Sequence, residues 1–152
     1  MEASTERVIY TAAAHVEGGR QQGHGRTEDG ELEVELRMPT ELGGEGGGTN
    51  PEELFAVGWA ACFESALGAV ARRQRLEVDD VAIDSKVMLI PTENRAFKLG
   101  AELDVTLPSI DDEEQAVELV RAAHGVCPYS NVTRGNIEVK LTANGTPVGT
   151  SD

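Results

Sequence analysis

The chain has 152 residues and a mass of 16.2 kDa, and 39% of its residues are hydrophobic while 26% are charged. This size and composition predict one globular domain over residues 1–152. Acidic residues number 27 against 13 Lys plus Arg, and the pI is near 4.5. This charge disfavours a nucleic-acid partner and an anionic membrane surface, because both attract basic proteins.

Targeting and membrane segments are not expected from the sequence. Residues 1–7 are polar, and no apolar run with a cleavage site follows them. The most apolar stretch, residues 54–70, contains Glu64 and Ser65 and falls short of the roughly 20 apolar residues that a membrane span needs. We therefore expect a cytoplasmic protein.

The N-terminal third is predicted to contain strands. Residues 7–16 are rich in Val, Ile, Tyr and Thr and predict a strand, whereas the glycines of 18–30 predict turns. An Asp-Gly pair at the end of that stretch signals a hairpin. Over residues 32–38 hydrophobic and charged residues alternate, which is the period of a strand with one buried face. The glycines of 43–48 predict a flexible loop.

A long apolar helix is predicted next. Pro51 suits the first helical position, and Glu52 and Glu53 suit the positive end of the helix dipole. Over residues 54–71 the helix is apolar on nearly every face, so we expect it to be buried on all sides. One domain of this size cannot easily enclose such a helix, which favours a partner subunit. Gly58 is a point where the helix could kink or split.

The rest of the chain continues the mixture of strands and helices. Strands are predicted over 81–90, 97–107 and 137–141, and a helix over 111–124. The tail after residue 144 is expected to fray. The order strands, helix, strands, helix, strand predicts an α+β fold with mostly antiparallel sheet.

Two cysteines are the candidates for chemistry. Cys62 lies within the apolar helix, where a cysteine is commonly a small core residue. Cys127 follows a helix end and precedes a proline, so the chain turns there and we expect a reachable thiol. In a reducing compartment such a pair is either two inert core thiols or a redox pair. The local pattern leaves both interpretations open.

Other kinds of site find little support. The three histidines show no ligand spacing and no Cys-x-x-Cys is present, so we expect no metal site. The glycine run lacks the Lys-Ser/Thr of a phosphate loop, and no Gly-x-Ser-x-Gly elbow occurs. Arg20, in a glycine-rich turn, is either a surface arginine or a guanidinium on a mobile loop that enters a pocket. Glu52 is first of all a charge at a helix terminus.

Two segments resemble the cysteine motifs of the organic hydroperoxide resistance (Ohr) branch of the Ohr/OsmC family. They are residues 50–63, NPEELFAVGWAACF, and residues 126–137, VCPYSNVTRGNI. The resemblance extends from about residue 8 to residue 141. Trp59 stands where the family pattern has Tyr, and Val132 where it has Ala.

The resemblance implies a fold and an activity. The fold would be OsmC-like, with mostly antiparallel sheets wrapped around buried central helices in an intertwined homodimer. The activity would be that of a thiol peroxidase without metal, haem or another bound cofactor. It would reduce alkyl and fatty-acid hydroperoxides to alcohols, and its external reductant would be the dihydrolipoyl group of a lipoylated protein.

The resemblance also implies roles for four residues. Cys62 would be the peroxidatic cysteine, which becomes a sulfenic acid. Cys127 would be the resolving cysteine, which closes a disulfide with Cys62. Arg20 would hold Cys62 as the thiolate and polarise the peroxide, and Glu52 would orient Arg20.

A substrate pocket is predicted around Cys62, because apolar side chains there would each bury part of an alkyl chain, at roughly 0.8 kcal/mol per CH₂. The predicted lining is Leu54, Phe55, Val57, Trp59 and Phe63. Three alternatives remain: an osmotically induced branch member with other substrates, a lipid-binding module whose cysteines only pack, and a redox sensor. The absence of a basic DNA-binding face disfavours the sensor.

Overall fold

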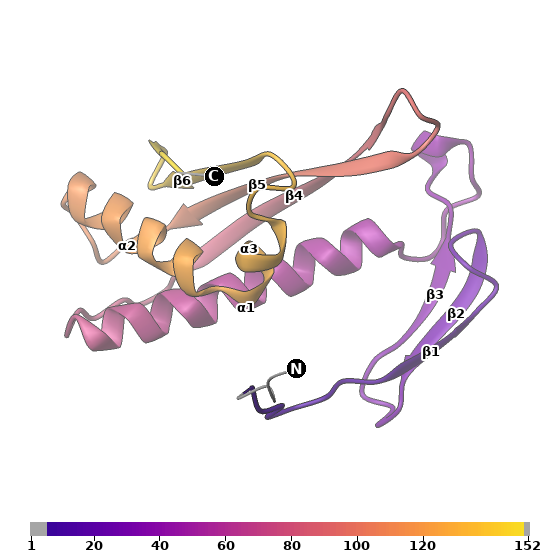
Figure 1. The fold of residues 1–152 in the computed structure, drawn as a ribbon, viewed down its shortest axis with the longest axis horizontal. Coiled ribbons are helices and arrows are strands. Elements are labelled where there is room, and N and C mark those ends of the chain that lie inside the picture. Colours follow the sequence, from indigo (N-terminus) through magenta and orange to yellow (C-terminus); the bar gives the residue numbers. More distant parts are fainter. Residues whose placement is uncertain (1–5, 151–152) are drawn as a thin grey trace, which may run out of the picture. The chain divides into compact units, whose positions relative to one another are not determined.

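The computed structural model describes residues 6–150, which form two compact units. The N-terminal unit extends to Pro51 and the C-terminal unit begins at Glu52. Figure 1 traces the chain through both units, and each is described here by itself. The grouping of both units into one domain stays a prediction.

The N-terminal unit contains an antiparallel sheet in the order β1-β2-β3. Its strands are β1 (Ala14–Glu17), β2 (Gln22–Thr27) and β3 (Glu33–Arg37). The strand predicted over 7–16 was wrong in extent, because Ala14 pairs with Thr27, the last residue of β2. The residues before Ala14 therefore have no ladder partner on β2. Val8, Ile9 and Tyr10, which precede β1, are exposed.

Strand β2 was missed because glycines occupy alternate positions in it. A Cβ atom on Gly23 would lie 1.9 Å from the carbonyl oxygen of Gly19, so only glycine permits this approach of the two backbones. The predicted hairpin that follows is confirmed, since β2 pairs antiparallel with β3. Its turn contains Gly30 at φ +77°, and the Asp29 carboxylate accepts hydrogen bonds from the Thr27 hydroxyl and the Glu31 N–H.

The loop between β3 and the long helix contains one turn of 3₁₀ helix, η1 (Thr40–Leu42). The loop returns to the sheet at its end. The Thr49 N–H donates to the Glu35 carbonyl oxygen, and the Arg37 N–H donates to the Thr49 carbonyl oxygen, both at 2.9 Å.

The C-terminal unit combines helices with a sheet in the order β4-β5-β6-β7. Strands β5 and β6 are parallel, and the other neighbours are antiparallel. The parallel step is possible because two helices connect β5 to β6. The elements are α1 (Pro51–Arg73), β4 (Ala82–Pro91), β5 (Phe97–Thr106), α2 (Glu113–Val126), α3 (Pro128–Thr133), β6 (Val139–Ala143) and β7 (Thr146–Val148). This arrangement confirms the α+β class with mostly antiparallel sheet.

Two elements of this unit were not predicted. One is helix α3, which begins at Pro128 directly after Cys127. Proline at the first helical position is a known start signal, but six residues are too few to show a helical period. Strand β7 pairs with β6 through a two-residue turn at Asn144 and Gly145, whose φ values are +48° and +85°. Positive φ at both positions defines the hairpin turn that Asn-Gly favours, so the tail does not fray there as expected.

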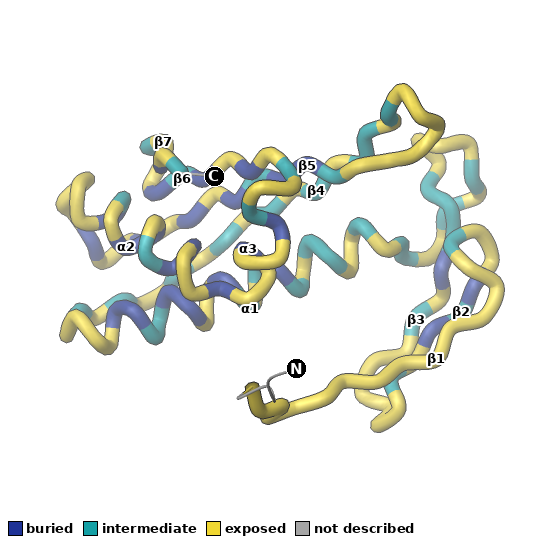
Figure 2. The backbone as a smooth tube through the Cα atoms, in the orientation of Figure 1, coloured by how far each residue is buried: buried dark blue, intermediate teal, exposed yellow. Residues whose placement is uncertain are grey.

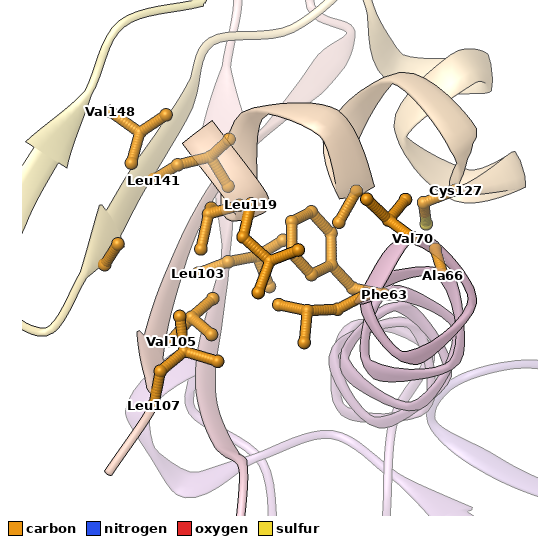
Figure 3. Packing of buried hydrophobic residues seen from close by; sticks show 14 of the residues in the cluster. Phe63, Ala66, Val70, Leu103, Val105, Leu107, Leu119, Cys127, Leu141 and Val148 are labelled. Carbon is orange, nitrogen blue, oxygen red and sulfur yellow. The ribbon is translucent and has the colours of Figure 1, made fainter. Parts of the chain in front are cut away.

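The core of the C-terminal unit lies between the sheet and helices α1 and α2. Figure 3 shows Phe63 and Val70 of α1 pointing toward Leu119 of α2 and Leu103 and Val105 of β5. All five side chains are buried, with exposed fractions of 5% or less. This packing sets the position of α1 against the sheet.

Helix α1 runs without interruption through Gly58, so the predicted split was wrong. Within this chain α1 is buried along one side only, as Figure 2 shows, and Val57 is 70% exposed. The buried residues of α1 are Trp59, Phe63, Ala66, Leu67, Val70 and Ala71. Burial on all sides with the help of a partner subunit stays a prediction.

Within residues 6–150, α1 is the one helix that is long and apolar enough to cross a membrane by length and composition. The core helix of a soluble protein passes the same test. Because the buried side of α1 belongs to the core cluster, we treat α1 as a core helix.

Candidate active site

The two cysteine side chains lie in contact although they are far apart in the sequence. Cys62 is near the middle of α1 and is half-buried, whereas Cys127 lies between α2 and α3 and is 0% exposed. Both are free thiols, and they lie close enough that the Cys127 thiol raises the pKa of the Cys62 thiol. The fold therefore brings together the two residues predicted to react with each other. The expectation of a reachable Cys127 was wrong, because this side chain belongs to the buried core (Figure 3).

Backbone geometry explains where Cys127 points. Cys127 ends α2 and starts α3, with an extended conformation of φ −63° and ψ 123°. Its N–H donates to the Ala123 carbonyl oxygen at 2.9 Å, and its carbonyl oxygen accepts from the Asn131 N–H at 3.0 Å. Pro128 at the first position of α3 favours this break, since a residue before proline avoids the helical region. One extended residue between two helices thus turns α3 back onto α1.

The surroundings of Cys62 disfavour its thiolate form. Burial raises the pKa of the Cys62 thiol above its ordinary value, and the neighbouring Cys127 thiol raises the pKa further. The backbone N–H of Tyr129 lies near the Cys62 sulfur and acts in the opposite direction, lowering this pKa. The net shift is upward, so within the C-terminal unit the thiol is weakly ionised at neutral pH.

Aromatic side chains surround this contact. The Phe55 ring meets both Trp59 and Tyr129 edge to face, each at a centroid distance of 5.6 Å. The Tyr129 ring lies over Gly58, where a Cβ atom would be only 2.9 Å from the tyrosine hydroxyl oxygen. Gly58 therefore makes room for Tyr129 one helical turn before Cys62, a role that the sequence pattern did not reveal.

Polar contacts hold α3 in place. The Trp59 indole N–H donates to the Ser130 hydroxyl oxygen at 3.2 Å, and both side chains are 0% exposed. At the other end of α3, the Arg134 guanidinium donates to the His124 carbonyl oxygen and to the Asn131 side-chain oxygen, each at 2.6 Å. The sequence analysis assigned no role to Ser130 or Arg134. Their hydrogen-bond partners are brought close only when α1, α2 and α3 have folded together.

Arg20 and Glu52 fall in different units. Arg20 lies in the turn between β1 and β2 in the N-terminal unit, following Gly18 and Gly19 at φ +79° and +65°. Glu52 lies in the first turn of α1 in the C-terminal unit and is half-buried. The pairing of Arg20 with Glu52, and with Cys62, stays a prediction.

The predicted pocket residues divide into two groups. Trp59 and Phe63 are 0% exposed and belong to the core rather than to an accessible surface. Leu54 is 36% exposed and Val57 is 70% exposed, while Phe55 is half-buried against the aromatic neighbours described above. Helical spacing placed all five near Cys62 but could not separate the side facing the sheet from the side facing away from it.

Metal ligands are not grouped in the described part of the chain. Across residues 6–150, no three His, Cys, Asp or Glu side chains are placed so that they could hold a metal ion. The His24 imidazole contacts two carboxylates of β3, Glu35 at 2.8 Å and Glu33 at 3.0 Å, and these three side chains form exposed ion pairs.

These features define a class: a small α+β protein in which a half-buried helix thiol contacts a fully buried second thiol. A family model described as OsmC-like protein matches residues 44–142. The chain belongs to this Ohr/OsmC family, so the family resemblance and the OsmC-like fold are confirmed.

Related proteins and structures agree with this assignment. The chain is 49% identical to the organic hydroperoxide resistance protein of Xanthomonas axonopodis pv. citri over 92% of this chain and 98% of that protein. It is similar to the crystal structure of an organic hydroperoxide resistance protein from Legionella pneumophila, at 50% identity and a TM-score of 0.85, covering 89% and 97% of the two chains. A Vibrio cholerae structure of a putative organic hydroperoxide resistance protein, with captopril bound in one of its active sites, matches at 41% identity and a TM-score of 0.89, covering 95% and 99%.

Proposed function

We propose that this protein detoxifies organic peroxides, and that it does so as a cysteine-based peroxidase that reduces organic hydroperoxides to alcohols. The contact between the half-buried Cys62 thiol and the buried Cys127 thiol carries the proposal. The similarity to proteins named for organic hydroperoxide resistance, over nearly their whole length, supports it.

In the first step, the Cys62 thiolate attacks the distal oxygen of the hydroperoxide. The O–O bond breaks, the sulfur gains that oxygen as a sulfenic acid, and the alkoxide leaves and takes up a proton to become the alcohol. Sulfur is oxidised and the peroxide is reduced by two electrons. Cys62 suits this role better than Cys127 because its side chain is partly exposed.

In the second step, the Cys127 sulfur attacks the sulfenic sulfur of Cys62. An S–S bond forms and the hydroxyl group leaves as water after taking up the thiol proton. An external dithiol then reduces the disulfide by thiol-disulfide exchange. We propose the dihydrolipoyl group of a lipoylated protein as this reductant, with no bound cofactor.

Arg20 is the residue that we propose lowers the pKa of the Cys62 thiol. Burial raises the pKa of the Cys62 thiol, and only the thiolate is a good nucleophile. A guanidinium within a few ångströms favours the ionised form, and arginine stays charged at every relevant pH. We propose that Arg20 supplies this charge and polarises the peroxide, and that Glu52 orients the guanidinium.

We propose that the substrates are alkyl and fatty-acid hydroperoxides, which gain binding energy from apolar side chains near Cys62. Leu54, Phe55 and Val57 retain accessible surface for an alkyl group in this structure. Each buried CH₂ contributes about 0.8 kcal/mol, a gain that hydrogen peroxide cannot obtain. Equal catalytic efficiencies for hydrogen peroxide and cumene hydroperoxide would count against this preference.

We further propose a cytoplasmic homodimer. Within the chain, α1 is buried along one side only, and the apolar residues Val8, Ile9 and Tyr10 are 79%, 85% and 77% exposed. Apolar side chains left uncovered in one chain favour burial against a second copy. Sedimentation equilibrium tests this point directly: a dimer supports it and a monomer at micromolar concentration contradicts it.

The function is tested by single-turnover peroxide consumption. Reduced wild-type protein, Cys62→Ser and Cys127→Ser are each mixed with excess cumene hydroperoxide, without reductant. We expect the wild type to consume one equivalent, Cys62→Ser to consume none, and Cys127→Ser to consume at least one equivalent as Cys62 is oxidised further. Consumption by Cys62→Ser at the wild-type rate, or none by the wild type, would overturn the proposal.

A further inference from the structure

The contact between α1 and α3 contains one buried hydrogen bond between side chains. Trp59 of α1 donates its indole N–H to the Ser130 hydroxyl oxygen of α3 at 3.2 Å, and neither side chain has any exposed surface. The bond joins residues 71 positions apart in the sequence. It is therefore a tertiary contact that fixes the place of α3, which is only six residues long.

This hydrogen bond has a regular relation to the two cysteines. Trp59 precedes Cys62 by three residues in α1, and Ser130 follows Cys127 by three residues. Residues three apart lie on the same face of a helix, about one turn from each other. The two helices thus meet at two neighbouring points, the thiol contact and the indole-hydroxyl bond. Two points of contact restrict rotation of α3 as well as its distance from α1.

The aromatic contacts add to this docking without replacing it. Tyr129 lies over Gly58 and against Phe55, and its backbone N–H reaches the Cys62 sulfur. These contacts are made by the ring and the backbone, and none of them accepts the indole hydrogen of Trp59. A tryptophan side chain has a single donor, so the loss of its acceptor leaves a buried N–H unsatisfied.

The backbone carbonyl of Ser130 also accepts hydrogen bonds. Its carbonyl oxygen accepts from the Thr133 hydroxyl at 3.1 Å and from the Arg134 N–H at 2.9 Å. The hydroxyl oxygen of Ser130 is the atom of this residue that accepts a hydrogen bond from α1. Truncation of that one oxygen removes the bond while the turn of α3 around Ser130 keeps its hydrogen bonds.

We propose that Trp59 and Ser130 are positioning residues that hold Cys127 against Cys62 for disulfide closure. The inference rests on the proposed function for its biological meaning. In the step concerned, the Cys127 sulfur displaces hydroxide from the sulfenic sulfur of Cys62, forming S–S and releasing water. A shift of α3 lowers the effective concentration of one sulfur at the other. The expected loss is about tenfold in the equilibrium constant for closure, the usual effect of one buried hydrogen bond.

The test measures the reduction potential of the Cys62–Cys127 pair in glutathione buffers, with the disulfide first formed by diamide. Ser130→Ala and Trp59→Phe each remove the hydrogen bond, and each is expected to make the disulfide about tenfold easier to reduce, a rise of about 30 mV in potential. Ser85→Ala is the matched control, because it removes a hydroxyl that donates to the Ala56 carbonyl oxygen of α1 at 2.9 Å, a bond in which α3 takes no part. We expect this control to leave the potential unchanged.

The double variant decides whether the two residues act through one bond. If they do, Ser130→Ala combined with Trp59→Phe shifts the potential no further than either change alone. If the variants have a lowered melting temperature but an unchanged reduction potential, the bond has only a structural role and the proposal is overturned. The proposal is also overturned if the potential shifts of the two single variants add in the double variant. A wild-type disulfide that forms with diamide but not with cumene hydroperoxide would refute the proposed function alone.

The emission of Trp59 gives an independent signature, since it is the one tryptophan of the sequence. We expect closure of the wild-type disulfide to change this emission, and Ser130→Ala to shift the emission of the reduced protein. Unchanged spectra in both comparisons would contradict the docking role.

Discussion

Replacement of Gly58 by alanine separates helix stability from the geometry of the thiol site. In an ordinary helix interior this change stabilises by about 1 kcal/mol, because alanine loses less backbone entropy than glycine. At Gly58, however, the new Cβ would lie 2.9 Å from the Tyr129 hydroxyl oxygen and 3.3 Å from the ring carbon that carries it. These distances force the tyrosine ring away from α1.

The magnitude follows from these opposing effects. The Tyr129 ring is 38% exposed and can move aside, so the cost is mainly the loss of its edge contact with Phe55, about 0.5–1.5 kcal/mol. This cost offsets the gain in helix propensity, so Gly58→Ala should be about as stable as the wild type, to within about 0.5 kcal/mol. Gly125→Ala in α2 is the matched control, since nothing lies within 4 Å of its Cβ position. The control should be more stable than Gly58→Ala by about 0.5–1.5 kcal/mol.

The assay has two parts, both at one protein concentration and with reduced thiols. Thermal unfolding should separate the two variants, since about 1 kcal/mol corresponds to about 2–4 °C at this chain length. Alkylation of Cys62 by iodoacetamide across a pH series should shift to higher pH in Gly58→Ala. The reason is that a shift of Tyr129 moves its backbone N–H away from Cys62, and this N–H lowers the pKa of Cys62. Equal stability of the two variants with the same alkylation profile would show that Gly58 makes no room for Tyr129.

Two further predictions concern charge. Arg20→Met should move the pH profile of the Cys62 reaction with cumene hydroperoxide to higher pH, because the thiolate loses the nearby positive charge. Below the thiol pKa the reaction rate should rise about tenfold per pH unit, and Arg20→Lys should show a smaller shift. Stopped-flow rates between pH 6 and 9 that coincide with those of the wild type would exclude a role of Arg20 in ionising Cys62. A hydrogen bond to Glu35, and to a lesser extent one to Glu33, raises the pKa of His24 above its ordinary value. Its ion pairs therefore stabilise the sheet fully below the unfolded-state pKa of about 6.5. This contribution is lost as pH rises through the folded-state pKa. His24→Gln should therefore increase hydrogen exchange in β2 more at pH 6 than at pH 9, and an equal increase at both would contradict it.

Regular periodicity made much of the fold predictable. The alternation in β3 and β5 and the apolar run of α1 are local signals, and the observed elements agree with them to within a few residues. Strand β2 was not predicted because its glycines are required by a tertiary contact, the close approach of Gly23 to the Gly19 carbonyl oxygen. Helix α3 was not predicted because its stability comes from packing on α1 rather than from its own six residues.

The site was predictable only in part for a similar reason. The motifs identified Cys62 and Cys127, and the structure brings them into contact. The burial of Cys127 and the space that Gly58 leaves for Tyr129 depend on how α3 packs against α1, a tertiary contact that the local sequence does not reveal. Trp59 looked like a pocket residue from its position in an apolar helix, but its indole N–H is engaged by Ser130 in the core.

In the proposed function Cys62 reacts with a hydroperoxide and Cys127 resolves the product, and both steps change the mass of the protein. Intact-mass spectrometry is therefore applied to the reduced protein after addition of one equivalent of cumene hydroperoxide. We expect the wild type to lose two hydrogen atoms, with a peptide map showing Cys62 joined to Cys127, and Cys127→Ser to gain one oxygen atom on Cys62. Free thiols of unchanged mass in the wild type, or an oxygen atom carried by Cys127, would contradict the proposed function.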